Sequence, residues 1–338
     1  RLGSQLDRVT RLRSLSAQIA DRMGTDNAKV SRAAELCKAD LLSGMVGEFP
    51  TLQGTMGRYY ALAQGESSDV ADALEQYYQP RFANDHIPTS KVATALALAD
   101  KLDVIVGIFG VGLIPSGEKD PFALRRQAIG IIRILTEHPV ELNLLEVISL
   151  TAEKFPQELE LNIDESKIKS FIIDRFKGYL KDKGYSVDKI EAILATDSNH
   201  LHLVQPRLAA IDEFLKTDDA IALATANKRI KNILKKNNAD NHDRVEARLF
   251  STEEEESLYK KIQTLMPKVA KAIDQMRYSD ALKTLSTVRN EVDFFFEEVM
   301  VMSDDPAERA NRLGLLSQLS ALLNCVGDLS ELSIAVTN

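Results

Sequence analysis

A group of lysines near residue 230 has the residue types and spacing best suited to binding chemistry. Apolar residues at 222, 226, 230 and 233 predict a helix, whose other side carries Lys228, Lys231, Lys235 and Lys236. Basic helix faces often contact only water, but the formal net charge of the whole chain is −8, which sets this cluster apart. Asn227 and Asn232 add hydrogen-bond donors that can discriminate between ligands. We interpret this face as a candidate surface for phosphates and bases.

Arrangements that carry catalysis are missing from the sequence. No nucleophile is recognisable beside a base and an orienting group, and no cluster has metal-ligand spacing. The glycine-rich stretch 107–117 lacks the Gly-Lys-Ser/Thr ending of a phosphate-binding loop, and no strand pattern precedes it. Cys37 and Cys325 lie far apart, which favours two core thiols in a reducing cytosol over a disulfide or a zinc site.

Composition indicates an all-α protein. The chain has 338 residues, which suggests two or three domains, and it contains no Trp and little Gly or Pro. Its longest apolar run, 102–114, is broken by Asp103 and glycines and is too short to cross a bilayer. No signal peptide opens the chain, and its first residue is Arg1, so we expect a cytoplasmic protein of which this chain is a fragment.

Helical periodicity predicts several helices in the first 140 residues. Apolar spacing predicts a helix at 5–23, with basic residues on its other side, and a second from about 30 to 49, stopped by Pro50. A further helix is expected at 91–106, followed by a bend at 107–117. Glycines at 54 and 57 favour close packing of the backbone against a neighbouring helix.

A helix start is predicted at Asp120, which has N-cap character and is followed by Pro121 in the first turn. Three cations lie close to this start, namely Lys119, Arg125 and Arg126. Their positions suit contacts with phosphates as well as ion pairs with carboxylates of neighbouring helices, and the sequence does not decide between these two roles.

The second half of the chain is predicted to contain a helical connector and a separate helical domain. Thr252, followed by four glutamates, has the pattern of a helix N-terminus, and so has Asp305 followed by Pro306. The segment 292–302 contains Phe294, Phe295 and Phe296, which cannot share one face, so we expect this helix to be packed on more than one side.

Several phrases of the sequence are similar to those of a known family. They read Lys-Ala-Asp-Leu-Leu-Ser-Gly-Met-Val-Gly-Glu-Phe at 38–49, Leu-Gln-Gly-Thr-Met-Gly-Arg-Tyr-Tyr at 52–60, Leu-Ala-Asp-Lys-Leu-Asp at 98–103 and Lys-Asp-Pro-Phe-Ala-Leu-Arg-Arg at 119–126. Together they resemble the β subunit of bacterial-type, two-subunit glycyl-tRNA synthetase, over roughly its C-terminal half. The resemblance implies a heterotetramer in which the α subunit activates glycine with ATP and Mg²⁺ and β binds tRNA(Gly), with no cofactor in this fragment and no membrane.

A second resemblance concerns the first 140 residues, which are similar to the HD superfamily of metal-dependent phosphohydrolases. Ala39-Asp40 takes the place of the family's His-Asp pair, and Asp100 resembles its later Asp. The family's histidines are absent, because His86 is in a predicted loop and the other four follow residue 137. Two carboxylates without imidazoles make a poor hydrolytic site. We therefore expect Asp40 and Asp100 to be degenerate positions without metal.

A third resemblance places a tRNA-binding role in the last third. The phrase 299–302, with Arg309 and residues 311–313, resembles the helical anticodon-binding domain shared with arginyl- and cysteinyl-type synthetases. The stretch 227–234 is similar to the segment at which the C-terminal domain of the β-subunit family begins its helical bundle. Arg309 and Arg312 are three apart and are expected to share one face. The predicted tRNA-binding residues are Lys228, Arg229, Lys231, Asn232, Lys235, Arg309, Asn311, Arg312, Lys119, Arg125 and Arg126.

These resemblances lead to a predicted organisation with three parts. Residues 1–140 would form a degenerate HD-like helical domain, 141–202 a helical connector, and 203–338 a helical anticodon-binding domain. The expected function is recognition of tRNA(Gly), including its anticodon region, on behalf of the α subunit. Two alternatives stay open at this point, a metal-dependent HD-type phosphohydrolase and a non-catalytic helical interaction scaffold.

Overall fold

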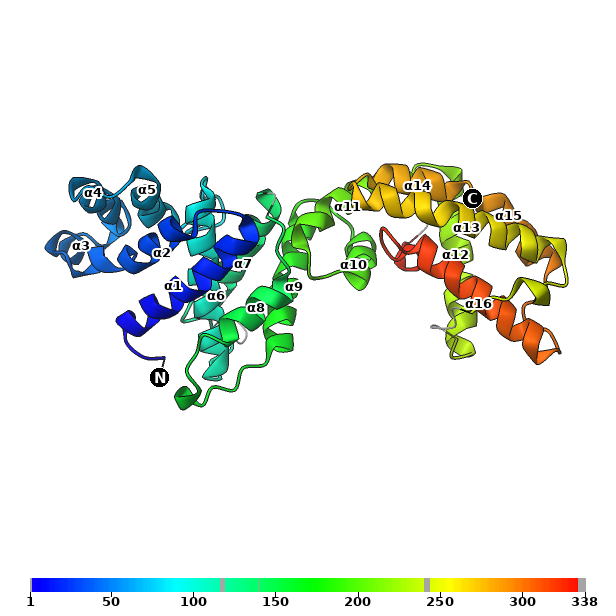
Figure 1. Cartoon of the computed structure of the whole chain (residues 1–338), viewed down its shortest axis with the longest axis horizontal. Helices are drawn as coiled ribbons and strands as arrows, with labels where there is room; N and C mark the ends of the chain where they lie inside the picture. The colour runs from blue at the N-terminus through cyan, green and yellow to red at the C-terminus, as the bar shows by residue number, and fades with distance from the viewer. Residues whose placement is uncertain (1, 116–118, 139, 240–243, 334–338) are drawn as a thin grey trace. The chain divides into compact units, whose positions relative to one another are not determined.

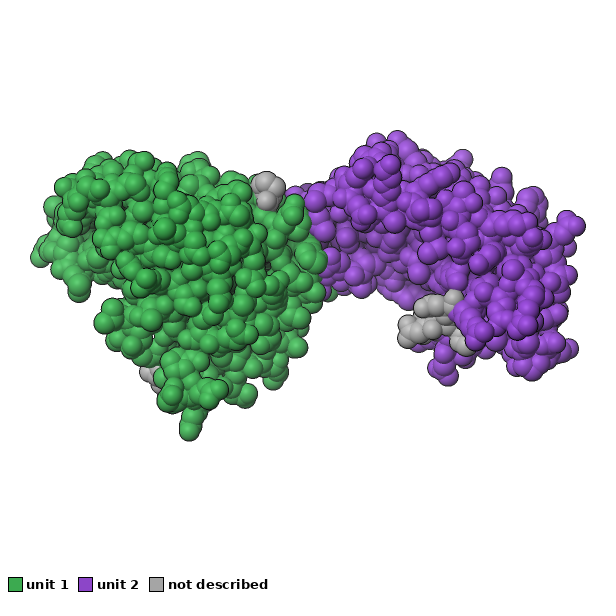
Figure 2. All heavy atoms as spheres, in the orientation of Figure 1, with its two compact units in different colours: residues 1–180, 199–202 green, residues 181–198, 203–338 purple. Residues whose placement is uncertain are grey.

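A computed structural model describes residues 2–115, 119–138, 140–239 and 244–333. Within these residues the regular structure is helical and no β-strand forms, which confirms the all-α prediction. The chain divides into two compact units (Figure 2). Unit 1 comprises residues 1–180 and 199–202, and unit 2 comprises residues 181–198 and 203–338. None of the helices in the described part combines the length and hydropathy needed to span a bilayer.

Unit 1 is built around α6 (Lys91–Gly110), against which α1, α2, α5, α7 and α8 pack (Figure 1). The sequence predicted a shorter helix with one core face. Almost every α6 side chain is buried instead, because packed helices surround it. All four residues 107–110 continue the helix, three of them buried, where the sequence predicted a bend. The other helices of unit 1 are α1 (Gln5–Met23), α2 (Asn27–Leu36), α3 (Gly44–Glu48), α4 (Thr55–Ala63), α5 (Ser68–Gln76), α7 (Leu124–Glu137), α8 (Leu144–Ala152) and α9 (Glu165–Asp182).

The prediction of a single helix at residues 30–49 is wrong. Helix α2 ends at Leu36 and is followed by the 3-10 helix η1 (Ala39–Leu42), which places Asp40 in a short turn. The chain then re-enters a helix at α3, capped by the Ser43 hydroxyl, which accepts a hydrogen bond from the Val46 amide. Periodicity missed this break because apolar residues continue on both sides of it. As a result, the Asp40 carboxylate faces inward and is 4% exposed.

The predicted close packing at Gly54 and Gly57 is confirmed. Gly54 has φ +83°, and a Cβ there would lie 2.7 Å from the Tyr78 ring. A Cβ on Gly57 would lie 3.3 Å from the Asp40 carboxylate. These contacts hold α4 against the end of α5.

The start of α7 differs in detail from the prediction. Its first helical residue is Leu124, and the preceding Ala123 has a left-handed backbone with φ 55°. The Asp120 carboxylate nevertheless accepts hydrogen bonds from the Leu124 and Arg125 amides at 2.8 and 2.9 Å. Asp120 therefore caps the helix from a turn upstream, and Pro121 lies in that turn rather than in the helix.

Unit 2 is a set of helices in which α12 (Asp218–Lys236) contacts α14, α15 and α16. The predicted N-termini are confirmed, because Thr252 forms a capping box with Glu255 and Asp305 caps a helix that begins with Pro306. The remaining helices of unit 2 are α10 (Val187–Thr196), α11 (Val204–Phe214), α13 (Glu253–Asp274), α14 (Tyr278–Ser286), α15 (Arg289–Glu298) and α16 (Pro306–Leu323).

Helix α15 ends at Glu298 and is not packed on several sides as expected. Only Val292 and Phe295 are buried, whereas Phe294 is 59% exposed and Phe296 is half-buried. The helix lies at the edge of unit 2, so one face meets the core and the other stays open. The Phe294 ring is therefore exposed and the Phe296 ring is partly accessible.

The segment predicted as a connector, 141–202, is shared between the two units: α8 and most of α9 belong to unit 1, and α10 belongs to unit 2. The functional boundaries at 140 and 202 stay a prediction. Short 3-10 helices join the longer elements, namely η1, η2 (Pro50–Leu52), η3 (Gln157–Leu159), η4 (Leu201–Leu203), η5 (Ala247–Leu249) and η6 (Leu329–Glu331).

Candidate nucleic-acid interface

The basic face of α12 is largely exposed. Lys228, Asn232 and Lys235 are all exposed and follow one another at four- and three-residue spacing, so they form one ridge along the helix. Within the described residues, Lys228 and Lys235 make no ion pair. Acidic Asp218 and Asp219 occupy the first turn of α12 and lysines the last, which complements the helix dipole. The cluster therefore keeps its helix stable while leaving positive charge available for phosphates.

Lys231 lies differently from its neighbours. Its ammonium donates to Asp328 at 2.6 Å and to Glu331 at 2.9 Å. Partial burial lowers the pKa of Lys231, but the two hydrogen bonds outweigh this effect and the pKa is raised. It thus joins α12 to η6. Asn227, which the sequence offered as a discriminating donor, is fully buried and donates to Asn324 at 2.7 Å. Asn227 is therefore a packing residue, because its amide cannot reach a ligand.

Arg229 points toward α15. Its guanidinium carbon lies 4.1 Å from the centroid of the Phe296 ring. Both residues line a cleft of about 580 Å³ in unit 2. Sequence reasoning included Arg229 but missed Phe296, although three adjacent phenylalanines on a short helix were a signal that one ring would be accessible.

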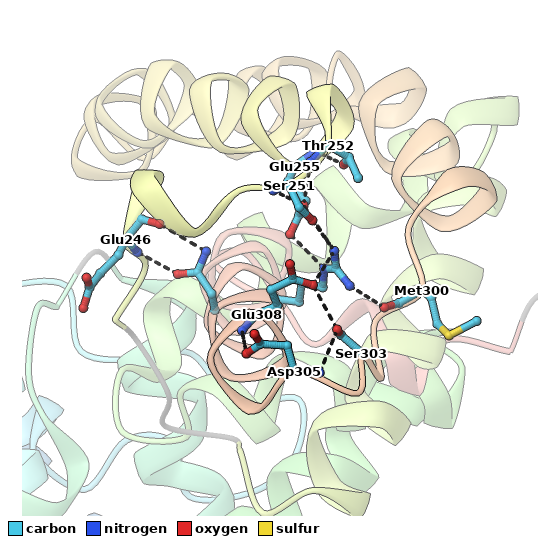
Figure 3. A network of polar contacts seen from close by, with 10 residues as sticks. Glu246, Ser251, Thr252, Glu255, Met300, Ser303, Asp305 and Glu308 are labelled. Atoms are coloured by element: carbon cyan, nitrogen blue, oxygen red, sulfur yellow. Dashed lines mark hydrogen bonds and ion pairs between the residues drawn. The ribbon is translucent and has the colours of Figure 1, made fainter.

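Arg312 is the centre of a buried network, whose partners Ser251, Glu255 and Met300 are labelled in Figure 3. Its Nε donates to Glu255 Oε1 at 2.8 Å, and its other nitrogens donate to the Met300 carbonyl and the Ser251 hydroxyl, each at 2.8 Å. The Arg312 side chain is 7% exposed and that of Glu255 is fully buried. The guanidinium therefore ties α16 to the start of α13 and to the segment after α15.

Asn311 plays a similar part beside it. Its side-chain oxygen accepts from the Glu246 amide at 2.7 Å, and its amide nitrogen donates to the Glu246 carbonyl at 3.2 Å. Asn311 and Arg312 were predicted to bind tRNA, and this is corrected here, because buried groups with satisfied hydrogen bonds cannot contact RNA. Arg309 is half-buried and donates to the Ser303 carbonyl at 3.2 Å, and Arg312 donates to the Met300 carbonyl, so the two arginines both contact the segment before α16. The predicted contact of Arg309 with tRNA stays a prediction.

The cations near the start of α7 belong to unit 1. Lys119 and Arg126 are exposed and Arg125 is half-buried. Their predicted contact with tRNA stays a prediction.

The two degenerate HD positions are occupied by internal polar contacts. Asp100 pairs with Arg8 at 2.8 Å and with Lys38 at 3.1 Å. Burial raises the pKa of Asp100, but the charges of Lys38, Arg8 and Lys101 outweigh it and hold this pKa at about 2. Asp40 accepts a hydrogen bond from the Gly54 amide at 2.6 Å.

These contacts do not fit a divalent metal. An ammonium and a guanidinium already neutralise the Asp100 carboxylate, and no group of three or more His, Cys, Asp or Glu suited to a metal forms in the described part of the chain. The basic residues expected on the outer side of α1 include Arg8 and Arg11, which instead face Asp100 and Asp103. Sequence reasoning missed these partners because it assigned arginines to the surface.

Comparison with known families now decides the relationship. The sequence model described as glycyl-tRNA synthetase beta subunit matches residues 1–195. The chain belongs to the glycyl-tRNA synthetase beta subunit family. A second model, described as DALR anticodon binding domain, matches residues 223–332, which contain the basic face of α12. The predicted resemblance to the β-subunit family is thereby confirmed, and so is the anticodon-binding domain predicted for the last third of the chain.

Curated members of this family are similar along almost the whole chain. The glycine–tRNA ligase beta subunit of Ralstonia nicotianae is 48% identical over 333 residues, which is 98% of this chain and 48% of the relative. Those of Aromatoleum aromaticum and Neisseria gonorrhoeae are 48% and 45% identical, with the same two coverages. The chain thus spans about half the length of the curated relatives it matches.

Proposed function

We propose that this chain is the tRNA-recognition part of a glycine–tRNA ligase beta subunit. It binds tRNA(Gly), including the anticodon region, so that an α subunit attaches glycine with ATP and Mg²⁺ in a cytoplasmic α2β2 enzyme. The observation that supports this proposal is that the anticodon-binding domain match includes the exposed ridge on α12, whose lysines make no ion pair with any residue the structure describes. The chain itself supplies binding and no covalent chemistry.

The contribution of this chain to the reaction is positioning. Lys228 and Lys235 contact backbone phosphates, which fixes the register of the RNA without reading its sequence. Holding one end of a tRNA converts part of the binding energy into correct placement of its other end at the α subunit. The acidic net charge does not oppose this role, because the ridge is a local concentration of positive charge.

A titration of the 338-residue chain with glycine tRNA at several salt concentrations tests the proposal. The expected result is binding that weakens steeply with salt and that weakens further when anticodon bases are changed. A tRNA specific for another amino acid is the control. Binding that ignores the anticodon would reduce the role to general phosphate contact. If no tRNA binds while a purified α subunit does, the protein-scaffold alternative replaces the proposal.

The phosphohydrolase alternative gains no support from the site. Its proposed ligand Asp100 is paired with Lys38 and Arg8, and Asp40 accepts a backbone hydrogen bond. We therefore do not propose metal-dependent hydrolysis for unit 1.

A further inference from the structure

The cleft between α12 and α15 has the composition of a site for a planar ring. It is open to solvent on the surface of unit 2, and its volume of about 580 Å³ lies within the ~300–1,000 Å³ range of small-molecule pockets. One wall comes from Ile221, Ala222 and Thr225 of α12, the other from Arg289 and Phe296 of α15. The α12 side of the cleft includes the small side chains of Ala222, Thr225 and Ala226.

Arg229 and Phe296 form a stacked pair at this cleft. The guanidinium carbon of Arg229 lies 4.1 Å from the ring centroid, and Arg229 makes no ion pair within the described ranges. Single-stranded RNA is bound by aromatic rings and guanidinium planes on which unstacked bases lie. The Arg229 guanidinium is held in place by an aromatic ring and not by a carboxylate. Its plane is therefore suited to stack on a base.

Carboxylates surround the cleft and restrict what can enter it. Arg289 pairs with Asp219 at 2.8 Å and lies 3.6 Å from Asp293, so its charge is already compensated. Glu297 lines the cleft and is exposed, with no ion pair in the part of the chain that the structure describes. A phosphate would be repelled here. A base with an exocyclic amino group would be attracted, because Glu and Asp accept from the cytosine N4 amino group.

The lysine ridge continues from the same helix. Lys228 adjoins Arg229 in sequence, and Asn232 and Lys235 extend the ridge toward the C-terminal end of α12. Phosphates on the ridge and a base in the cleft would be parts of one bound strand. The ridge would thus bind the phosphates of the RNA backbone, and the cleft would recognise one RNA base.

We propose that the α12–α15 cleft binds one unstacked cytosine, which stacks on the face of the Arg229 guanidinium opposite Phe296 and donates a hydrogen bond from its amino group to Glu297. This inference rests on the proposed function, which makes a glycine tRNA the source of the base. Glycine codons begin with two guanines in the standard genetic code, so the matching anticodon contains two cytosines. Uracil carries a carbonyl oxygen where cytosine carries its amino group, and Glu297 would repel it.

The test measures the affinity of the full chain for three transcribed tRNAs: glycine tRNA and two variants in which one anticodon cytosine is replaced by uracil. We expect one of the replacements to weaken binding by about tenfold, the usual order for a lost base contact. Glu297→Gln should remove this preference, because an amide can also donate to uracil. Phe296→Leu should weaken binding of all three tRNAs by about tenfold, because the Arg229 guanidinium loses the ring that holds it in place for stacking on the base.

Matched controls lie on the same helix. Glu298→Gln changes a neighbouring exposed acid and Phe294→Leu a neighbouring exposed ring, and neither residue lines the cleft. Both variants should keep wild-type affinity and preference. Equal effects of Glu297→Gln and Glu298→Gln, or a wild-type chain that binds all three tRNAs equally, would overturn the cytosine site while leaving tRNA binding in place. Absence of binding to any tRNA would overturn the proposed function as well.

Discussion

The ammonium of Lys38 lies 3.1 Å from the Asp100 carboxylate, with 10% and 11% of the two side chains exposed. The same ammonium lies 4.7 Å from the centroid of the Tyr77 ring and donates to its hydroxyl at 3.1 Å. A buried cation with three such contacts is difficult to remove, because each partner loses its compensation. Lys38 and Asp100 are therefore a structural pair that joins the α2–η1 segment to α6.

Replacing Lys38 by Met should strongly destabilise unit 1. The substitution keeps most of the side-chain volume but removes one of the two ion pairs that Asp100 makes within the described residues and leaves the pair with Arg8, at a cost on the order of 3 kcal/mol. Amide hydrogen exchange of α6 under native conditions measures this loss within unit 1. Lys29→Met is the control, because Lys29 pairs with Asp69 at the surface and its loss should leave α6 protection unchanged.

Asp100 should also make unit 1 sensitive to acid. Its folded-state pKa is about 2, against an ordinary value of 3.8, so the unfolded chain takes up this proton first as the pH falls. The stabilising contribution is therefore complete above about pH 4 and is lost progressively toward pH 2. In Asp100→Asn, stability measured by urea unfolding should be lower at neutral pH and should change less between pH 4 and 2. If the stability of Asp100→Asn changes with pH between 4 and 2 as steeply as that of the wild type, Asp100 is not the source of the acid sensitivity.

The sequence was sufficient for the helices with strong N-terminal signals and for the exposed lysines. Thr252, Asp305 and Lys228 behave as their local patterns predict, because capping and exposure depend on near neighbours in the chain. The roles of Asn227 and Arg312 depended on partners that lie far along the chain. Helical spacing places these side chains on a face of the helix, but it does not reveal that Asn227 contacts Asn324 and that Arg312 contacts Glu255.

Two errors share another cause. The break after Leu36 and the one-sided burial of α15 were missed because apolar residues were taken as evidence of continuous, buried helix. Leu42 is 91% exposed and Phe294 is 59% exposed, so apolar character alone did not decide burial. Whether another helix covers a face is a tertiary property.

Arg312→Met should unfold or loosen unit 2 and should not act as a simple binding variant. The change leaves the fully buried Glu255 carboxylate without its cation, at a cost of about 3–5 kcal/mol. We expect a lower melting temperature by circular dichroism, with any loss of tRNA binding following the loss of helix. Arg309→Met is a control of the same chemistry, because the Arg309 side chain is half-buried and donates to the Ser303 carbonyl at 3.2 Å, not to a buried carboxylate. Equal melting of the two variants would contradict a structural role for Arg312.

Lys228 and Lys231 provide the sharpest test of the lysine ridge, because they lie one turn apart on α12 but differ in pairing. Lys228 is exposed, whereas the charge of Lys231 is compensated by Asp328 and Glu331. Lys228→Met should reduce the slope of log K against log salt for tRNA by about 0.7–0.9, the value for one released phosphate contact. Lys231→Met should change this slope much less, since little free charge is lost. Filter-binding titrations at four or more salt concentrations measure both slopes. If both variants lower the salt slope equally, Lys231 leaves its carboxylates when RNA binds, and the ridge then includes Lys231. If neither variant changes the salt slope, the phosphates bind elsewhere on unit 2.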